Sequence, residues 1–227
     1  MTGQPPDRLP RVVAVGFNKC GTRAFAELFR RAGHPTIHHK VRDRLLLPRR
    51  IGKVMRDNLA AGRRVFDSVE DYIFYSDLIL SDGRMTWDGA SAFREILRDY
   101  PDTILILNLR DREAWIRSRL RHGHGEFARR EMAARGLTRP EDLTAAWRAD
   151  WEAHVTALRA FMQDRPDQFI EYNLDTDRPE SLVSRLPAYR LNPADFSDIG
   201  RTRGERMNAL HRQIKTAVAH LRPRFFR

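Results

Sequence analysis

The sequence predicts an α/β protein built as a three-layer sandwich with a central parallel sheet. Short apolar runs rich in β-branched residues alternate along the chain with longer segments whose apolar residues recur at helical spacing. Repeats, low-complexity tracts and long linkers that would divide the chain are absent from the sequence. This alternation is typical of a parallel sheet with helices on both faces. We expect a flexible N-terminus over residues 1–10 and a single domain over residues 11–227.

The N-terminal half is predicted to contain strands and helices in alternation. Residues 11–16 form an apolar strand that ends in glycine, and residues 22–32 form a helix with apolar residues at helical spacing and a glycine stop. A second short strand is expected over residues 35–39, followed by a basic helix over residues 43–61 that a glycine closes. The run Arg-Val-Phe-Asp-Ser at residues 64–68 predicts a third strand.

The C-terminal half continues the same pattern. Residues 91–100 are predicted to be helical, and residues 103–109 form the clearest buried strand because the run is almost entirely apolar. A last strand is expected over residues 168–174. Three further helices are predicted, over residues 112–121, 140–163 and 208–221.

Composition and charge narrow the classes of function. A chain of 227 residues suits one domain with a sizeable core, and its 41% hydrophobic content is too rich for a disordered basic tail. The 41 Lys and Arg against 30 Asp and Glu give a net charge of +11, which favours polyanionic partners such as nucleic acid, anionic lipid or phosphate- and sulfate-bearing small molecules. Apolar runs stay well short of the roughly 18–20 residues of a membrane span. A lone cysteine, Cys20, and the lack of a visible secretory signal predict a cytoplasmic protein.

The loop after the first predicted strand has the composition of a phosphate-binding loop. It reads Gly-Phe-Asn-Lys-Cys-Gly-Thr-Arg over residues 16–23 and leads directly into a helix, whose unpaired amides and dipole favour an anion. Lys19 and Thr22 add a charge and a hydroxyl. Lys19 precedes Gly21 by two positions, so the Walker A pattern is not met, and the residue six positions after Cys20 is alanine, which excludes a cysteine-phosphatase loop. The alternative is an ordinary turn with a solvated lysine.

A second polar motif follows the strand predicted over residues 103–109. Arg110 lies where a parallel strand opens onto a ligand crevice, and Ser118 follows about two helical turns later. A guanidinium and a hydroxyl that meet there can bind one terminal phosphate. Alternatively, Arg110 caps the sheet through Asp111 or Glu113, and Ser118 faces solvent.

The two motifs together resemble the sulfotransferases that use 3′-phosphoadenosine 5′-phosphosulfate (PAPS). That family has a Lys-x-Gly-Thr loop, here residues 19–22, and an Arg with a Ser eight residues later, here Arg110 and Ser118. The Arg-Asp-x-x-x-Trp-x-x-Ser setting is similar to the bacterial and heparan-type branches. The resemblance implies a P-loop-like fold and transfer of a sulfuryl group from PAPS to an acceptor hydroxyl or amine, with release of adenosine 3′,5′-bisphosphate and no metal. The chain departs from the common pattern at Cys20 and Arg23.

The resemblance also implies roles for individual residues. Lys19 would neutralise charge on the bridging oxygen of the donor, and Arg110 with Ser118 would hold the 3′-phosphate. The basic pair Arg201 and Arg203 either folds over the nucleotide or forms a solvated loop. The loop residues that would contact the donor are Asn18, Lys19, Cys20, Gly21, Thr22 and Arg23.

An acceptor hydroxyl also needs a proton acceptor. In the family this is a His or an acidic residue at the end of a strand between the two phosphate motifs. The predicted third strand offers Asp67, Glu70 and Asp71, and the second offers His38 and His39. We rank the acidic residues first because their strand is the closer match in chain order. Each of the five has a simpler alternative as a helix cap, a salt-bridge partner or a surface residue.

Two other functions are compatible with parts of the pattern. A nucleotide or metabolite kinase would handle phosphate but would need the Walker lysine. A nonenzymatic nucleic-acid-binding module would need exposed aromatics, whereas Trp115, Trp147 and Trp151 have the helical spacing of core residues. His122 and His124 lack further clustered ligands, so no metal site is expected. We therefore expect an acceptor that is a small molecule or a glycan, anionic or neutral, rather than nucleic acid.

Overall fold

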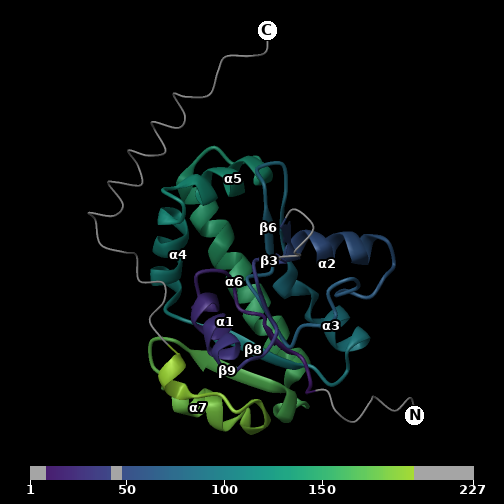
Figure 1. Ribbon diagram of the computed structural model, residues 1–227. Helices are drawn as coiled ribbons and strands as arrows, with labels where there is room; N and C mark the ends of the chain where they lie inside the picture. The colour runs from purple at the N-terminus through teal and green to yellow at the C-terminus, as the bar shows by residue number, and fades with distance from the viewer. Residues whose placement is uncertain (1–8, 42–47, 197–227) are drawn as a thin grey trace, which may run out of the picture. The chain divides into compact units, whose positions relative to one another are not determined.

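The computed structural model describes residues 9–41 and 48–196 and confirms the α/β architecture (Figure 1). Seven strands form one sheet: β1 (Val12–Ala14), β2 (Thr36–His38), β3 (Lys40–Val41), β4 (Arg49–Arg50), β5 (Phe74–Ser76), β8 (Ile104–Leu109) and β9 (Phe169–Asn173). Their order is β4-β3-β2-β5-β1-β8-β9. Strands β2, β5, β1, β8 and β9 run parallel to one another. Beyond β2, strand β3 pairs antiparallel with β2, and β4 pairs antiparallel with β3. A separate antiparallel hairpin consists of β6 (Ile79–Ser81) and β7 (Thr86–Asp88).

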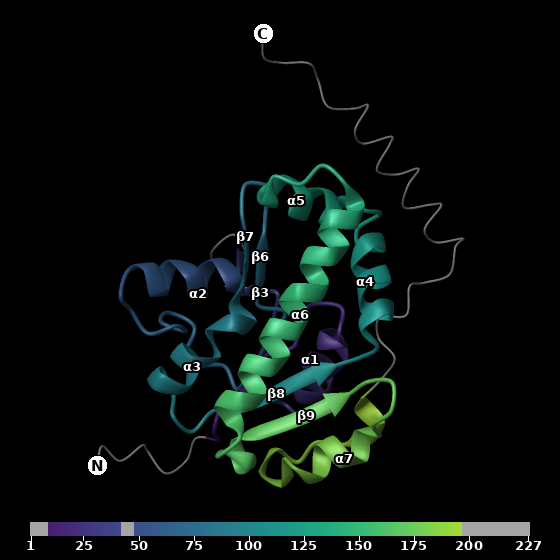
Figure 2. The same cartoon turned by 180° about the vertical axis from the view of Figure 1, so that it is seen from behind.

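Helices cover both faces of the sheet (Figures 1 and 2). The α-helices are α1 (Thr22–Arg31), α2 (Ile51–Ala60), α3 (Phe93–Asp99), α4 (Arg112–Arg121), α5 (Glu126–Arg135), α6 (Pro140–Met162) and α7 (Pro179–Ser184). Four short 3-10 helices are η1 (Gly89–Ala92), η2 (Pro166–Gln168), η3 (Pro187–Tyr189) and η4 (Pro193–Asp195). Helices α1 and α7 pack on one face, and α2 to α6 contribute to the apolar core on the other.

The alternation of side chains along β1 builds the two cores. Val12 and Ala14 belong to the core that contains Phe25 and Phe29 of α1, whereas Val13 and the following Val15 belong to the core that contains α2 to α6. Successive side chains of a strand point to opposite faces, so a strand covered on both faces must be apolar throughout. This explains why residues 12–15 form an uninterrupted apolar run.

The strand order determines where a ligand can bind. Strand β1 lies between β5 and β8, and all three run parallel. Their carboxyl ends therefore meet at one edge, and the loops that leave Ala14, Ser76 and Leu109 lie side by side. In open parallel sheets ligands bind at this edge, next to the strand where the connections change direction.

The third parallel strand is not where the sequence predicted it. Residues 64–68 form turns and coil, and β5 begins only at Phe74. Val65 and Phe66 are buried, but the Val65 amide donates to the Asp99 carboxylate at 2.8 Å instead of pairing in a sheet. The prediction of a strand at residues 64–68 was wrong. Two consecutive apolar residues that are buried in a turn have the same sequence pattern as a short buried strand.

Other boundaries also differ from expectation. The helix predicted over residues 43–61 begins at Ile51, because Arg49 and Arg50 pair with β3. Helix α5, helix α7 and the β6–β7 hairpin were not predicted. The helix predicted over residues 208–221 lies outside the described residues. The single domain ending at residue 227 and the cytoplasmic location stay predictions. Within the part of the chain that the structure describes, no helix is long and apolar enough to cross a bilayer.

Candidate active site

The loop at residues 16–23 is held in place by hydrogen bonds from strand β8 and helix α4. The Asn108 side chain, completely buried at the end of β8, accepts from the Gly16 amide at 2.8 Å and donates to the Cys20 carbonyl at 2.7 Å. The Trp115 indole donates to the Asn18 carbonyl at 3.0 Å. These three bonds fix the loop at its first residue and at two positions in its middle.

Two glycines allow the loop to pack this closely. A Cβ at Gly16 would lie 2.0 Å from the Asn108 carbonyl oxygen, so only glycine fits beside β8. Gly21 has a φ of 73°, and a Cβ there would lie 2.1 Å from a methyl group of Leu174. Both positions therefore require glycine for close approach, and Gly21 also requires it for its left-handed backbone.

Lys19 lies next to Arg110, the residue that follows strand β8. Lys19 is half-buried and has a φ of 72°, in the left-handed region. An Arg110 NH group donates to the Lys19 carbonyl at 3.4 Å, and the Arg110 Nε is buried without a hydrogen-bond partner among the described residues. Burial lowers the pKa of Lys19, and the nearby Asp77 carboxylate opposes this shift. The two predicted phosphate motifs therefore meet in one place.

The remaining loop residues differ in what they can offer a ligand. Thr22 is buried as the first residue of α1, and Arg23 is exposed. The Asn18 side-chain oxygen is buried and has no hydrogen-bond partner within the described chain. The Cys20 thiol is completely buried, burial raises its pKa, and its amide donates to the Phe17 carbonyl at 3.3 Å. Cys20 therefore packs beneath the loop, and its thiol is not available to a ligand above it.

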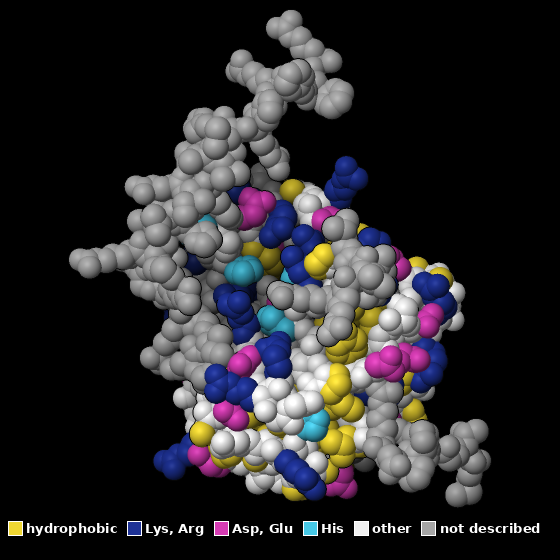
Figure 3. All heavy atoms as spheres, viewed as in Figure 1, with side chains coloured by type: hydrophobic (Ala, Val, Ile, Leu, Met, Phe, Trp, Pro, Cys, Tyr) yellow, Lys and Arg dark blue, Asp and Glu magenta, His cyan; other side chains and the backbone are white. Residues whose placement is uncertain are grey.

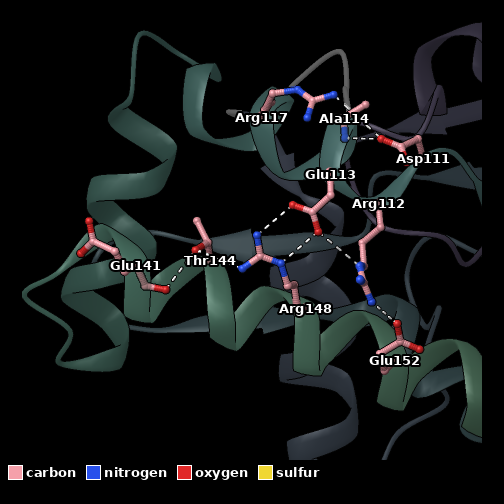
Figure 4. A network of polar contacts seen from close by, with 9 residues as sticks. All are labelled: Asp111, Arg112, Glu113, Ala114, Arg117, Glu141, Thr144, Arg148 and Glu152. Atoms are coloured by element: carbon pink, nitrogen blue, oxygen red, sulfur yellow. Dashed lines mark hydrogen bonds and ion pairs between the residues drawn. The ribbon is translucent and has the colours of Figure 1, made fainter.

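Helix α4, which carries Ser118, is anchored at its first turn (Figure 4). The Asp111 carboxylate caps the helix by accepting from the Ala114 amide at 2.7 Å. Glu113 accepts two hydrogen bonds from Arg148 of α6, at 2.9 and 2.8 Å. Ser118 is half-buried and follows Trp115 by three residues, so it lies on the side of α4 that faces the loop.

The first residue after β5 is an acid that the sequence analysis missed. Asp77 Oδ1 is buried and has no hydrogen-bond partner in the described residues, while Oδ2 lies 3.8 Å from His38 Nε2 and 3.7 Å from His39 Nδ1. Burial raises the pKa of Asp77 to about 6, against the opposing effect of Lys19. Asp77 thus has the acid–base properties and the strand-end position of a proton acceptor.

His38 and His39 surround this carboxylate. Burial, together with the neighbouring His39 and Arg23, lowers the pKa of His38 to about 4, and burial also lowers the pKa of His39. His38 Nδ1 lies 3.2 Å from the Ser76 hydroxyl. Both imidazoles are therefore neutral at pH 7, and their contacts with Asp77 are polar contacts between a carboxylate and neutral rings.

The acidic residues ranked first by the sequence analysis lie at the opposite edge of the sheet. Glu70 accepts from the Tyr100 hydroxyl at 2.6 Å, and its carbonyl accepts from Arg11, the residue before β1, at 3.0 Å. Asp67 pairs with Arg63 at 3.3 Å. Asp67, Glu70 and Asp71 all precede β5, so they are at its amino end, whereas Lys19 is beyond the carboxyl end of β1.

The misplaced strand explains why Asp77 was overlooked. The run Ile-Phe-Tyr-Ser over residues 73–76 is a β-favouring segment that ends directly at this acid, and this signal was present in the sequence. Arg201 and Arg203 lie outside the described residues. Among the residues that the structure describes, no group of three or more His, Cys, Asp or Glu side chains could hold a metal ion.

The five-stranded parallel sheet and the glycine-lined loop after its central strand define a P-loop-like α/β protein whose site is suited to an anionic ligand. Residues 11–180, which are 170 of the 227 residues, match the family model described as a sulfotransferase domain. The chain therefore belongs to the sulfotransferase family, as the two motifs indicated. The narrower resemblance to the bacterial and heparan-type branches stays a prediction. A comparison with curated proteins finds no match.

Proposed function

We propose that the protein is a PAPS-dependent sulfotransferase that moves a sulfuryl group to an acceptor hydroxyl or amine and releases adenosine 3′,5′-bisphosphate. The observation that carries this proposal is the contact between the two phosphate motifs, in which Arg110 donates to the Lys19 carbonyl at 3.4 Å. The donor is an adenosine that carries a phosphosulfate on its 5′ carbon and a phosphate on its 3′ carbon, so its binding site needs two groups of anion-binding residues close together. Family membership supports sulfuryl transfer in general.

The donor fits the groups that the site leaves without partners. The buried Arg110 Nε and Asn18 Oδ1 have no hydrogen-bond partner among the described residues, and the first amides of α1 follow Gly21. Arg110 and Ser118 would bind the 3′-phosphate, and Lys19, Thr22 and the loop amides would bind the 5′-phosphosulfate.

The transfer step assigns opposite tasks to Lys19 and Asp77. The acceptor oxygen or nitrogen forms a bond to sulfur while the bond from sulfur to the 5′-phosphate oxygen breaks. Lys19 would stabilise the negative charge that develops on that leaving oxygen, and Asp77 would take the proton from the acceptor. Lys19 and Asp77 each shift the pKa of the other, which supports a site that contains both groups.

Binding of adenosine 3′,5′-bisphosphate tests the donor without knowledge of the acceptor. We expect this nucleotide to raise the melting temperature in a saturable way, and 5′-AMP to do so much less, because only the bisphosphate occupies both anion sites. The substitution Arg110→Gln should remove most of the difference between the two nucleotides. Arg117→Gln, which removes an exposed arginine of α4, should retain it.

Two results would count against the proposal. If the bisphosphate and 5′-AMP stabilise the protein equally, Arg110 and Ser118 do not bind a 3′-phosphate. Stronger stabilisation by ATP with Mg²⁺ than by the bisphosphate would favour a kinase-like phosphotransferase.

A further inference from the structure

Several basic groups beside Asp77 are not required by the donor. Lys40 of β3 and Arg50 of β4 are directly opposite each other in an antiparallel pair. His39 precedes Lys40, its carbonyl accepts from the Ile51 amide at 3.0 Å, and its Nδ1 lies 3.7 Å from the Asp77 carboxylate. Two cations therefore lie on the strands next to His39, which itself contacts the proposed proton acceptor.

A third cation approaches from another layer. Arg130 of α5 packs on the turn of the β6–β7 hairpin, where its Cγ lies 3.6 Å from the position of a Cβ at Gly83. Arg50 reaches the same hairpin and donates to the Ser81 carbonyl at 2.9 Å. The pKa of His39 is lowered by burial and then by Arg50, Lys40 and Arg130, so all three cations are within electrostatic range of this imidazole.

The pairing of Lys40 with Arg50 lowers the stability of the folded protein. Like charges directly opposite each other in an antiparallel pair are destabilising. In the described part of the chain neither Lys40 nor Arg50 forms an ion pair, and Arg130 has a loose ion pair with Glu126 at 3.9 Å. His39 Nδ1 is buried and has no hydrogen-bond partner there. A bound anion would relieve the repulsion and supply the missing partner.

The hollow face of the molecule shows the same concentration of charge. In Figure 3, lysine, arginine and histidine side chains line the central hollow, with few acidic side chains between them. His122, directly after α4, is within electrostatic range of these cations: burial, followed by Lys19, Arg130 and His39, lowers its pKa to about 4. Basic residues therefore occur from the phosphate loop to β3, β4 and α5.

We propose that Lys40, Arg50 and Arg130 form a subsite for an oxyanion of the acceptor, so that the substrate class is an acceptor that already carries a sulfate, phosphate or carboxylate group. This inference rests on the proposed function, because it assumes that the acceptor is held beside Asp77. His39 lies between the subsite and Asp77, so it would contact both the oxyanion and the hydroxyl or amine that reacts.

The test uses the full-length protein saturated with adenosine 3′,5′-bisphosphate, which blocks the donor phosphate sites. Titration calorimetry with glucose 6-sulfate and glucose 6-phosphate should give saturable binding, and the neutral parent glucose should bind much more weakly. Preference between the two charged sugars would identify the oxyanion. Equal binding of glucose, or no saturable binding of either charged sugar, would overturn the proposal.

Matched arginine substitutions on one helix locate the subsite. Arg130→Gln should weaken binding of the charged sugars about tenfold or more, because a charge-assisted hydrogen bond is lost. Arg129→Gln removes the same charge from the neighbouring exposed position, which pairs with Glu126, and should change binding by less than about twofold. Lys40→Gln and Arg50→Gln should each act like Arg130→Gln. Equal effects of Arg129→Gln and Arg130→Gln would show general charge attraction instead of a site.

Failure of the subsite and failure of the donor assignment give different results. If adenosine 3′,5′-bisphosphate does not stabilise the protein, the proposed function is wrong. Binding of the charged sugars to nucleotide-free protein, lost in Arg130→Gln, would then still support an anion site. If the bisphosphate binds and the charged sugars do not, the donor assignment stands and the anionic acceptor is wrong.

Discussion

At the scale of single residues, the site concentrates unusual backbone conformations. Lys19, His39 and Asp77 have φ values of 72°, 59° and 56°, in the left-handed region that side chains other than glycine rarely adopt. Such a conformation costs roughly 1–3 kcal/mol and persists only where the surroundings fix it. All three residues are at the carboxyl edge of the sheet. We assign charge stabilisation to Lys19 and proton transfer to Asp77, and His39 contacts the Asp77 carboxylate.

The pKa of Asp77 predicts the pH dependence of turnover. Its pKa is raised to about 6, so the carboxylate is protonated below that value and cannot accept a proton. With an acceptor whose nucleophile does not itself titrate in this range, the rate should fall as pH decreases through about 6. Asp77→Asn should lower kcat by about 10²-fold or more and abolish this acidic limb, with binding of adenosine 3′,5′-bisphosphate retained.

A nearby exposed acid provides the control for this substitution. Asp82→Asn, in the turn after β6, should leave the rate and its pH profile unchanged. An acidic limb that survives in Asp77→Asn would transfer the role to His38 or His39. If the acidic limb is instead lost in a variant of Asp67, Glu70 or Asp71, the proton acceptor is one of these residues, which the sequence analysis ranked first.

Lys19 is expected to act mainly on the transition state. Lys19→Ala should lower kcat by about 10²–10³-fold and change the KM for the donor much less, because the loop amides and Arg110 still bind the nucleotide. Steady-state kinetics with an identified acceptor measures both constants. An unchanged kcat with a raised KM would make Lys19 a binding residue only.

At the scale of secondary-structure elements, one buried amide joins strand β8 to the phosphate loop. Asn108→Leu keeps a similar volume but leaves the Gly16 amide and the Cys20 carbonyl without their partner. Each buried unpaired group costs about 1–3 kcal/mol, so for two such groups we expect a loss of roughly 2–6 kcal/mol in the free energy of unfolding, measured by urea denaturation. Affinity for adenosine 3′,5′-bisphosphate should fall as well, since the loop is no longer fixed.

A second buried amide separates this effect from general destabilisation. Asn58→Leu removes two hydrogen bonds to the carbonyls of Val65 and Asp67, far from the loop. It should lower stability while the surviving folded protein binds the nucleotide normally. If Asn108→Leu also binds the nucleotide normally, the loop keeps its conformation without the Asn108 side chain.

How far the sequence predicted these elements depends on the range of the interactions that form them. The loop at residues 16–23 and the capped start of α4 are local, and their residue spacing was sufficient. Strand β5 depends on pairing with β2 and β1, whose paired residues are 38 and 62 positions away in the chain, so the competing run at residues 64–68 could not be rejected. Asn108 was visible as the one polar residue inside an apolar strand, yet its partners are about 90 residues away.

At the scale of the whole molecule, which carries a net charge of +11, the cationic side chains differ in whether an acidic side chain pairs with them. Many surface arginines pair with acids, as in the contacts among α4 and α6 (Figure 4). The groups at the carboxyl edge of the sheet are different, since Lys19, Lys40 and Arg50 form no ion pair within the described residues. Cations without an ion-pair partner thus gather at the site, which agrees better with a small anionic ligand than with a long nucleic acid lying across the surface.

The buried ionisable groups of the site should make folding depend on pH in two opposite ways. His38 has a folded-state pKa of about 4 against 6.5 for an ordinary histidine, so its stabilising contribution is present above pH 6.5 and is lost as pH falls toward 4. Asp77 has a folded-state pKa of about 6 against 3.8, so its contribution is present below pH 3.8 and is lost as pH rises through 6. Each amounts to at most about 3 kcal/mol.

These signs predict different behaviour for two variants. Because His39 and His122 shift in the same direction as His38, the wild-type free energy of unfolding should decrease between pH 7 and pH 5. His38→Gln should make this decrease smaller. Asp77→Asn should make it larger, and it should also raise stability at pH 7 because a buried carboxylate without full hydrogen bonding is removed. Urea denaturation at pH 5, 6 and 7 measures all three proteins. A variant of Asp77 that is less stable than the wild type at pH 7 would show that the carboxylate is stabilised by its surroundings, and the proton-acceptor assignment would lose its physical basis.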